Sequence, residues 1–189
     1  VSILAMSGGV PPSLKFAEMF PDRVDRMMLL SSAPFTPFSP QIEDRPLPTW
    51  AYAAVFGNDV VYWTLTKVAR RPLEESFDAR ADLRDNLSDA EAVFVRNLID
   101  TFLPASQRLA GVNSEGAAVD RAATYNLENI RAEVFVAHAR DDRLNPSDVG
   151  ATIAAGVPSG RFVEFERGGH LLLGHHEELR RDFAILLSN

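Results

Sequence analysis

The first 30 residues constrain the fold of this chain more than any other stretch. Residues 1–5, Val-Ser-Ile-Leu-Ala, are short, apolar and β-favouring, and residues 6–9, Met-Ser-Gly-Gly, follow as an abrupt turn. Residues 11–20 then favour a helix, and the run 24–30 is typical of a second buried strand. A strand that leads through a tight turn into a helix and then into another strand predicts a βαβ unit of a parallel sheet.

The turn places Ser7 between the strand and the helix. In a nucleophile elbow, a serine occupies a strained turn of this kind with its hydroxyl raised above the sheet. The positions two before and two after the serine must be small, because the backbones of strand and helix approach closely there. Ala5 and Gly9 meet this need, so the pattern is A-x-S-x-G. Ser7 is therefore a candidate nucleophile, although short Ser-Gly strings also occur in ordinary loops.

Composition excludes several classes of protein. The chain has 189 residues, which fits one domain or one domain with a sizeable insertion. Its formal charge is −7 with both signs interspersed, which argues against a nucleic-acid partner. No apolar run approaches the roughly 18 residues that cross a bilayer, so no membrane span is expected. The absence of cysteine excludes thiolate chemistry and disulfides, and it slightly favours a cytoplasmic location.

The pattern changes after residue 34. Residues 35–48 are rich in proline and cannot form regular structure, whereas the pattern from about 49 to 127 is helical. We expect a helix at Thr49–Phe56 and another that Asn58 or Asp59 caps and that stops near Pro72.

A third helix of this region should begin at a capping box. Ser88 and Glu91 have the S-x-x-E spacing of that motif. The spacing of the apolar residues predicts one buried face on this helix, made of Val93, Phe94, Leu98 and Phe102.

Parallel-sheet character returns at residue 133. Residues 133–137 and 161–165 favour strands, while residues 146–156 and 177–187 favour helices. The strands lead into two loops, His-Ala-Arg-Asp-Asp-Arg-Leu-Asn-Pro (138–146) and Glu-Arg-Gly-Gly-His (166–170). A serine needs a base to take its proton, and that base needs an acid to orient it. The two loops supply an acid and a histidine, and the glycine pair lets the second loop fold back towards Ser7.

These segments resemble the α/β-hydrolase superfamily. The similarity covers Ala5 to Gly9, Phe16 to Val24 and Met27 to Ser31, together with the two later loops. The first loop resembles the family's H-G-x-x-D-x-x-x-P motif, with Ala139 in place of glycine, and G-G-H resembles its catalytic-histidine loop.

The family order of serine, acid and histidine then implies a triad. The resemblance implies Ser7 as nucleophile, Asp142 as acid and His170 as base, with Asp141 as the rival acid. It implies that the backbone N–H of Gly8 supplies one oxyanion-hole donor, whereas the second donor comes from a loop after an early strand that this chain does not contain.

The resemblance also implies an architecture. We expect an α/β fold with a parallel-sheet hydrolase core at residues 1–34 and 131–189 and an inserted all-helical cap at residues 35–130. A complete member has several strands before the elbow, so this chain looks like the back portion of a larger protein. A missing N-terminal part of the same fold would be its partner.

The implied activity is that of a serine hydrolase acting on a carboxylic ester without a cofactor. The substrate would be a small acyl compound, and Phe35 and Trp50 could line an apolar acyl pocket. Thioesterases, acyltransferases, carbon–carbon bond hydrolases and cofactor-free peroxidases share the same chemistry, and a catalytically silent binding module is the alternative class.

The remaining histidines have structural interpretations. His138, at a strand end, is expected to be structural. His175 and His176 precede the last helix and are expected to be solvated or to lie just behind the catalytic groups. A zinc site made of His170, His175 and His176 is disfavoured, because their spacing fits no helical face and the chain has no cysteine.

Overall fold

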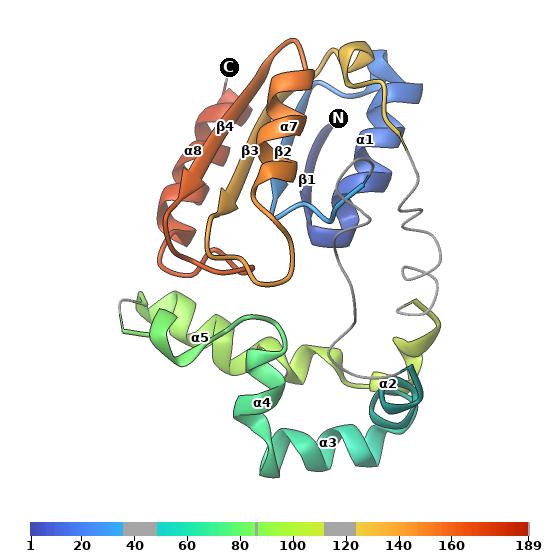
Figure 1. The fold of residues 1–189 in the computed structure, drawn as a ribbon, viewed down its shortest axis with the longest axis vertical. Helices are drawn as coiled ribbons and strands as arrows, with labels where there is room; N and C mark the ends of the chain where they lie inside the picture. The colour runs from blue at the N-terminus through green and yellow to red at the C-terminus, as the bar shows by residue number, and fades with distance from the viewer. Residues whose placement is uncertain (36–48, 86, 112–123, 189) are drawn as a thin grey trace.

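The computed structural model describes residues 1–35, 49–85, 87–111 and 124–188, without the side chains of residues 49–52. In this part of the chain a parallel sheet forms in which the strands lie side by side in sequence order: β1 (Ser2–Met6), β2 (Arg26–Leu30), β3 (Glu133–Ala139) and β4 (Gly160–Phe165). All carboxyl ends of the strands therefore meet at one edge of the sheet (Figure 1). The expected α/β fold with a parallel sheet is confirmed.

Helices cover both faces of this sheet. Along β2, Met27 and Leu29 face the cluster that contains α1 (Val10–Met19) and α7 (Asp148–Gly156), whereas Met28 faces α8 (His176–Ser188). Side chains of a strand alternate between the two faces, so a strand buried on both sides must be a continuous apolar run. The run Met-Met-Leu-Leu in β2 has this character.

The helices that do not cover the sheet lie at its carboxyl edge (Figure 1). They are α2 (Thr49–Phe56), α3 (Asp59–Val68), α4 (Arg70–Glu75) and α5 (Asp89–Leu98), with 3-10 turns at Ala81–Leu83, Asp100–Phe102 and Ala105–Gln107. We call the described residues 49–85 and 87–111 the cap. Two 3-10 turns, Pro21–Arg23 and Leu127–Asn129, belong to the connections between sheet and helices.

Both expected helix caps of this region form. The side chain of Asn58 accepts hydrogen bonds from the backbone N–H groups of Val60 and Val61, and Ser88 and Glu91 form a complete capping box. These side chains satisfy N–H groups that have no partner within the helix.

The prediction that the second helix stops near Pro72 was wrong. The chain breaks earlier, after Val68, and Pro72 lies in the first turn of α4. A proline there loses no hydrogen bond, because the first N–H groups of a helix lack an intrahelical acceptor.

The predicted buried face of α5 was wrong in part. Leu98 and Phe102 are half-buried and pack against apolar side chains, as predicted. Val93 and Phe94 are exposed, whereas Glu91, Val95 and Ile99 are buried. The buried residues are four apart, and the side chain of Glu91 turns inward because it has partners in both cap and core. An aromatic cluster forms in the cap around Tyr62, whose hydroxyl donates to the carbonyl of Ile99 at 2.9 Å.

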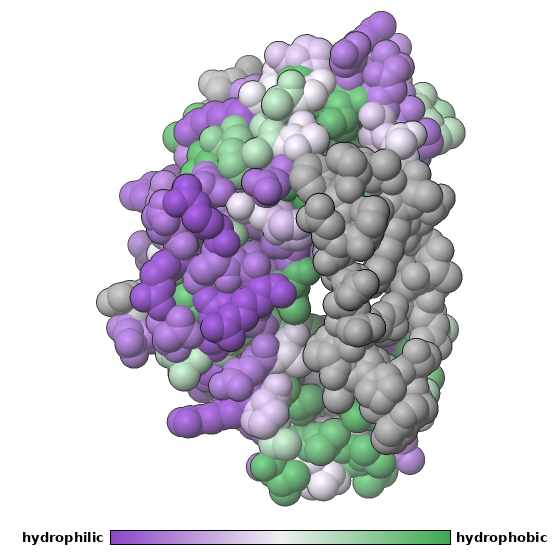
Figure 2. Space-filling view, in the orientation of Figure 1, coloured by the Kyte–Doolittle hydropathy of each residue, from purple (hydrophilic) through white to green (hydrophobic). Residues whose placement is uncertain are grey.

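The surface differs between the lower end of the molecule and its middle. Figure 2 shows apolar side chains at the lower end over α2 and α3, where Val60, Trp63 and Val68 are exposed. Hydrophilic side chains dominate where the cap meets the loops after β3 and β4. Within the described ranges, no helix combines the length and the apolar character needed to cross a membrane.

Candidate active site

Ser7 lies at the junction of β1 and α1, where the turn Ser7–Gly9 joins them. Its φ of +53° is rare for a residue with a side chain and is a feature of strained functional turns. A Cβ placed on Gly9 would lie 4.0 Å from the Cβ of Ala5, so these two positions do face each other, with room for a methyl group. Gly8 lies at the start of the helical segment, where N–H groups point outward without an intrahelical acceptor.

Asp142 and His170 meet over the carboxyl edge of the sheet. Asp142 lies in the acid loop (residues 140–146), which follows β3, and His170 lies in the histidine loop (residues 166–175), which follows β4. The Nδ1 atom of His170 is 2.9 Å from Oδ2 of Asp142, and the carboxylate is fully buried. Because a carboxylate only accepts, Nδ1 carries the proton and Nε2 is left as the basic atom of the neutral ring.

The carboxylate of Asp142 is held in its ionised form. Burial alone would raise its pKa, but hydrogen bonds from His138 and His170 and from the backbone N–H of Asn145 lower it well below the ordinary value. The other oxygen, Oδ1, accepts from the N–H groups of Leu144 at 2.8 Å and Asn145 at 3.0 Å. Both oxygens thus have two donors, which fixes the carboxylate in position.

His138, predicted to be structural, contacts the candidate acid directly. Its Nε2 atom lies 3.0 Å from Oδ2 of Asp142 and 3.2 Å from the carbonyl of Asn145, and the ring is fully buried. Both neighbours accept, so the proton is on Nε2, and Nδ1 is buried without a partner among the described residues. The sequence offered one signal for this contact, the strand-end histidine four positions before Asp142.

The structure brings Asp142 and His170 together but does not join His170 to Ser7. In the part of the chain that the structure describes, neither Oγ of Ser7 nor Nε2 of His170 makes a hydrogen bond. Catalytic hydrogen bonds are often long before substrate binds and shorten in the complex with substrate.

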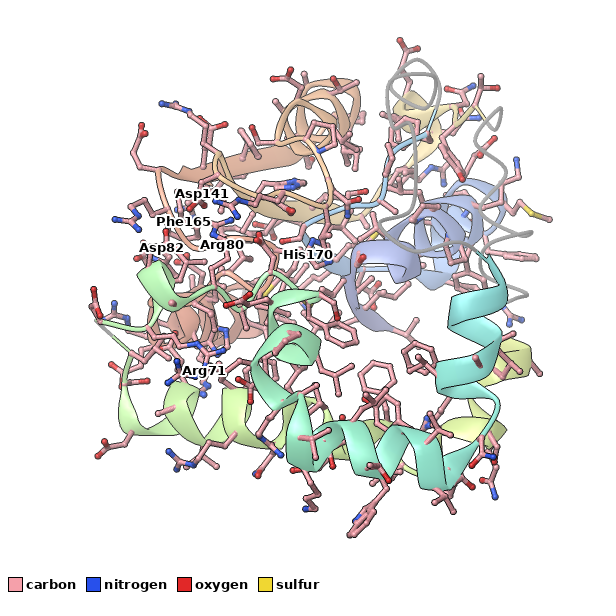
Figure 3. The ribbon with its side chains drawn as sticks, turned by 60° about the horizontal axis from the view of Figure 1, so that its bottom comes forward. Arg71, Arg80, Asp82, Asp141, Phe165 and His170 are labelled. Carbon is pink, nitrogen blue, oxygen red and sulfur yellow. The ribbon has the colours of Figure 1, made fainter. Side chains whose placement is uncertain are left out.

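The rival acid, Asp141, faces away from the imidazole. Its Oδ1 accepts from the backbone N–H of Gly169 at 2.8 Å, and its Oδ2 forms an ion pair with Arg80 of the cap at 2.5 Å. Figure 3 shows Arg80, Asp141 and His170 where the cap meets the two loops. Arg80 and its neighbour Asp78 were not predicted from the sequence, because alternating charges in this stretch are typical of a solvated turn.

The two predicted pocket residues have different outcomes. Phe35 is buried in the core next to α1 and packs edge-on against Tyr125, so its role in substrate binding stays a prediction. The side chain of Trp50 lies outside the described residues.

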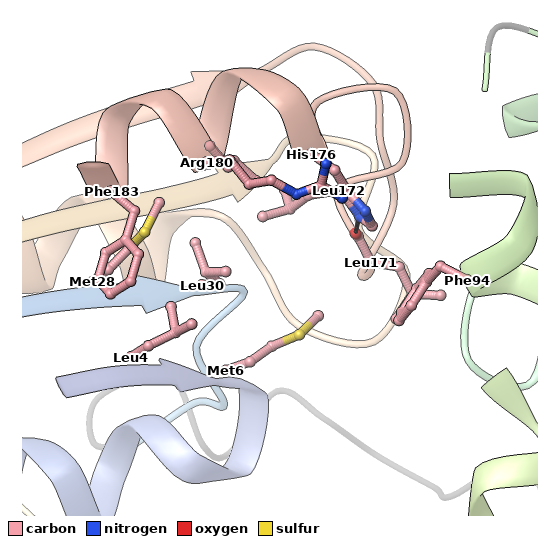
Figure 4. A pocket seen from close by; sticks show the side chains of 11 residues that line it. Leu4, Met6, Met28, Leu30, Phe94, Leu171, Leu172, His176, Arg180 and Phe183 are labelled. Carbon is pink, nitrogen blue, oxygen red and sulfur yellow. Dashed lines mark hydrogen bonds between the residues drawn. The ribbon is translucent and has the colours of Figure 1, made fainter. Parts of the chain in front are cut away.

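A different apolar cavity lies beside the elbow. It has a volume of about 280 Å³ and lies between β1, β2, α8 and the cap (Figure 4). Met6 and Leu171, the sequence neighbours of Ser7 and His170, both line it, together with Phe94 of the cap.

The side chains of His175 and His176 hydrogen-bond to backbone carbonyls of the histidine loop. His175 stacks on Phe165, and its Nε2 donates to the carbonyl of Arg167 at 2.9 Å. The Nε2 atom of His176 donates to the carbonyl of Leu171 at 2.9 Å.

Comparison with known proteins identifies the fold. No protein-family model and no curated protein matches the chain by sequence. Among solved structures, it is similar to an alpha/beta hydrolase fold protein from Nakamurella multipartita, with 20% identity and a TM-score of 0.66 over 98% of this chain and 68% of that one. It is also similar to 2-hydroxy-6-oxo-6-phenylhexa-2,4-dienoate hydrolase from Rhodococcus sp. strain RHA1, with 21% identity and a TM-score of 0.65.

A bromoperoxidase from Bacillus anthracis is a third similar structure, with 16% identity and a TM-score of 0.60. This chain is covered completely in the last two comparisons but spans only 64% and 67% of those chains. The chain therefore has the α/β-hydrolase fold and spans about two thirds of its neighbours. At these identities the likeness defines the fold, and function has to be argued from the site.

Proposed function

We propose that the chain provides the Ser7–Asp142–His170 triad of a serine hydrolase that cleaves carboxylic esters through an acyl-enzyme. The observation that carries this proposal is the buried, ionised Asp142 hydrogen-bonded to Nδ1 of His170. This arrangement supports the tautomer in which Nε2 can accept a proton. The strained backbone of Ser7 at the strand-to-helix turn supports its role as nucleophile.

In this mechanism Oγ of Ser7 attacks the carbonyl carbon of the ester while Nε2 of His170 takes the hydroxyl proton. The oxyanion that forms is stabilised by the N–H of Gly8, at a helix start where the dipole favours negative charge. His170 then gives its proton to the departing alcohol. Water, deprotonated by His170, attacks the acyl-enzyme and releases the acid and free Ser7.

The acyl group we propose is apolar. Met6 and Leu171, the sequence neighbours of the nucleophile and the base, line the cavity, and leucine, methionine and phenylalanine side chains make up most of its lining.

The division of the chain that we propose is a cap of residues 35–130 inserted into a core of residues 1–34 and 131–189. The missing N-terminal part of the fold would supply the second oxyanion donor.

Hydrolysis of p-nitrophenyl esters of increasing acyl length by the complete protein tests this function. We expect turnover that Ser7→Ala abolishes and Ser13→Ala retains, because the hydroxyl of Ser13 donates to the carbonyl of Gly9, in its own helical segment. Equal activity of Ser7→Ala and wild type would contradict the proposal. Turnover of a carbon–carbon substrate in place of esters would retain the triad and change the substrate class to that of a dienoate hydrolase, the activity for which the similar Rhodococcus enzyme is named.

A further inference from the structure

A turn of the cap reaches between the acid loop and the histidine loop. Asp78, at the centre of this turn, is only 2% exposed. Its Oδ2 accepts from the backbone N–H of His170 at 2.9 Å and from the backbone N–H of Arg143 at 3.2 Å. One carboxylate oxygen of the cap thus accepts a backbone hydrogen bond from each of the two loops.

Arg80 completes this contact. Its Nη1 donates to Oδ1 of Asp78 at 2.6 Å and to the carbonyl of Asp141 at 3.0 Å, and its Nη2 pairs with the carboxylate of Asp141. The side chains of Arg80 and Asp78 are 8% and 2% exposed, so their ion pair is shielded from water, whereas the Asp141 side chain is 26% exposed. We call Asp78 and Arg80 the cap clamp.

The backbone on both sides of the contact is shaped for it. Asp78 has a φ of +64° and Gly169 a φ of +59°. A Cβ on Gly169 would lie 2.7 Å from Oδ2 of Asp78 and 2.8 Å from Cδ1 of Leu83, so a side chain at this position would displace the clamp. The glycine before His170 therefore serves the approach of the cap as well as the turn.

Apolar side chains near the clamp also pack the histidine loop against the cap. Leu171 and Leu173 of the histidine loop share a buried cluster with cap residues, and Met6 packs against it. The cap members of this cluster are Ala79, Leu83 and Val95. The segment that carries His170 is therefore packed against the cap as well as against the sheet.

We propose that the cap clamp positions the catalytic base, so that the placement of the cap sets the geometry of His170 and Asp142. Asp78 and Arg80 are positioning residues, because they act on the backbone of His170 and on the acid loop and do not touch the reacting atoms. The inference rests on the proposed function. It predicts that the cap governs the chemical step as well as substrate entry.

The test compares Asp78→Ala with Asp85→Ala in the complete protein, using an ester that the wild type hydrolyses. Asp85 is an exposed acid of the same cap segment. We expect Asp78→Ala to lower kcat by about 10- to 100-fold with little change in KM, because a displaced base loses its alignment with the nucleophile. Asp85→Ala should keep the wild-type kcat. Circular dichroism of each variant would test whether it is folded.

Asp78→Asn is the second variant and decides the matter if Asp78→Ala does not fold. Its amide oxygen can accept from both loop N–H groups, so a smaller loss of kcat at unchanged KM is expected. A folded Asp78 variant with wild-type kcat, or one in which only KM changes, would overturn the inference and leave the proposed function intact. If wild type and Ser7→Ala are equally inactive, the proposed function fails, and the positioning role fails with it.

Discussion

Asp142 is the residue on which the other groups of the candidate site depend. Its two oxygens accept hydrogen bonds from two imidazoles and two backbone N–H groups. An asparagine could not replace it, because the NH₂ group of the amide would face donors. Asp142→Asn should therefore lower kcat by about 10⁴-fold, the loss typical when a triad aspartate becomes asparagine. Steady-state kinetics would measure this.

Asp141→Asn is the matched control for that change. Asp141 binds Gly169 and Arg80 and not an imidazole, so its loss should cost activity only several-fold. The reverse ranking of the two variants would transfer the role of the acid to Asp141.

Gly150, in α7, lies close to the imidazole of His138 in β3. A Cβ at this position would be 2.9 Å from Phe162 and 3.2 Å from Nδ1 of His138. Gly150→Ala should reduce the free energy of unfolding by about 1–3 kcal/mol, the usual cost of overpacking a core. Denaturant unfolding would measure this. An unchanged midpoint would show that α7 can move away from β3 at no cost.

At the scale of elements, Glu91 links two helices. Its Oε2 accepts from the backbone and hydroxyl of Ser88 at the start of α5, and its Oε1 accepts from the N–H groups of Gly174 and His176 at the start of α8. Glu91→Gln should cost about 1–3 kcal/mol of stability at neutral pH, because the amide nitrogen must face one set of donors.

The contribution of Glu91 should depend on pH. Burial raises its pKa, but the hydrogen bonds from Ser88, His176 and Gly174 outweigh burial and hold the pKa below the ordinary value of 4.5. The stabilisation is therefore complete above that value and is lost as the pH falls through the lowered pKa. The stability difference between wild type and Glu91→Gln should shrink in this acid range; a difference independent of pH would contradict the ionised state.

The sequence predicted the elements that positional patterns define. The alternation of strands and helices and the caps at Asn58 and Ser88 lie where local signals place them. Ser7, Asp142 and His170 lie in the turn and the two loops expected for them, and their catalytic roles stay predictions. The inward face of α5 could not be predicted, because Glu91 is buried by contacts with a helix more than 80 positions away. Asp78 escaped for the same reason, since its bond to His170 spans 92 positions.

At the scale of the whole molecule, the cap contacts the acid loop and the histidine loop through both hydrogen bonds and apolar packing. The chain spans about two thirds of the similar structures, and β1 is an edge of the sheet in the described residues. If the second oxyanion donor lies outside residues 1–189, these residues alone should hydrolyse esters about 10²- to 10³-fold more slowly than the complete protein. Parallel assays of both proteins would show this, and equal rates would place both donors within this chain.

In the proposed function Ser7 is the nucleophile and His170 is its base. Reaction of the complete protein with a fluorophosphonate, followed by peptide mass spectrometry, tests it most directly. We expect a single phosphonyl adduct on the peptide that contains Ser7, formed far more slowly in His170→Ala. An adduct on another serine, or no adduct on the folded wild-type protein, would contradict it.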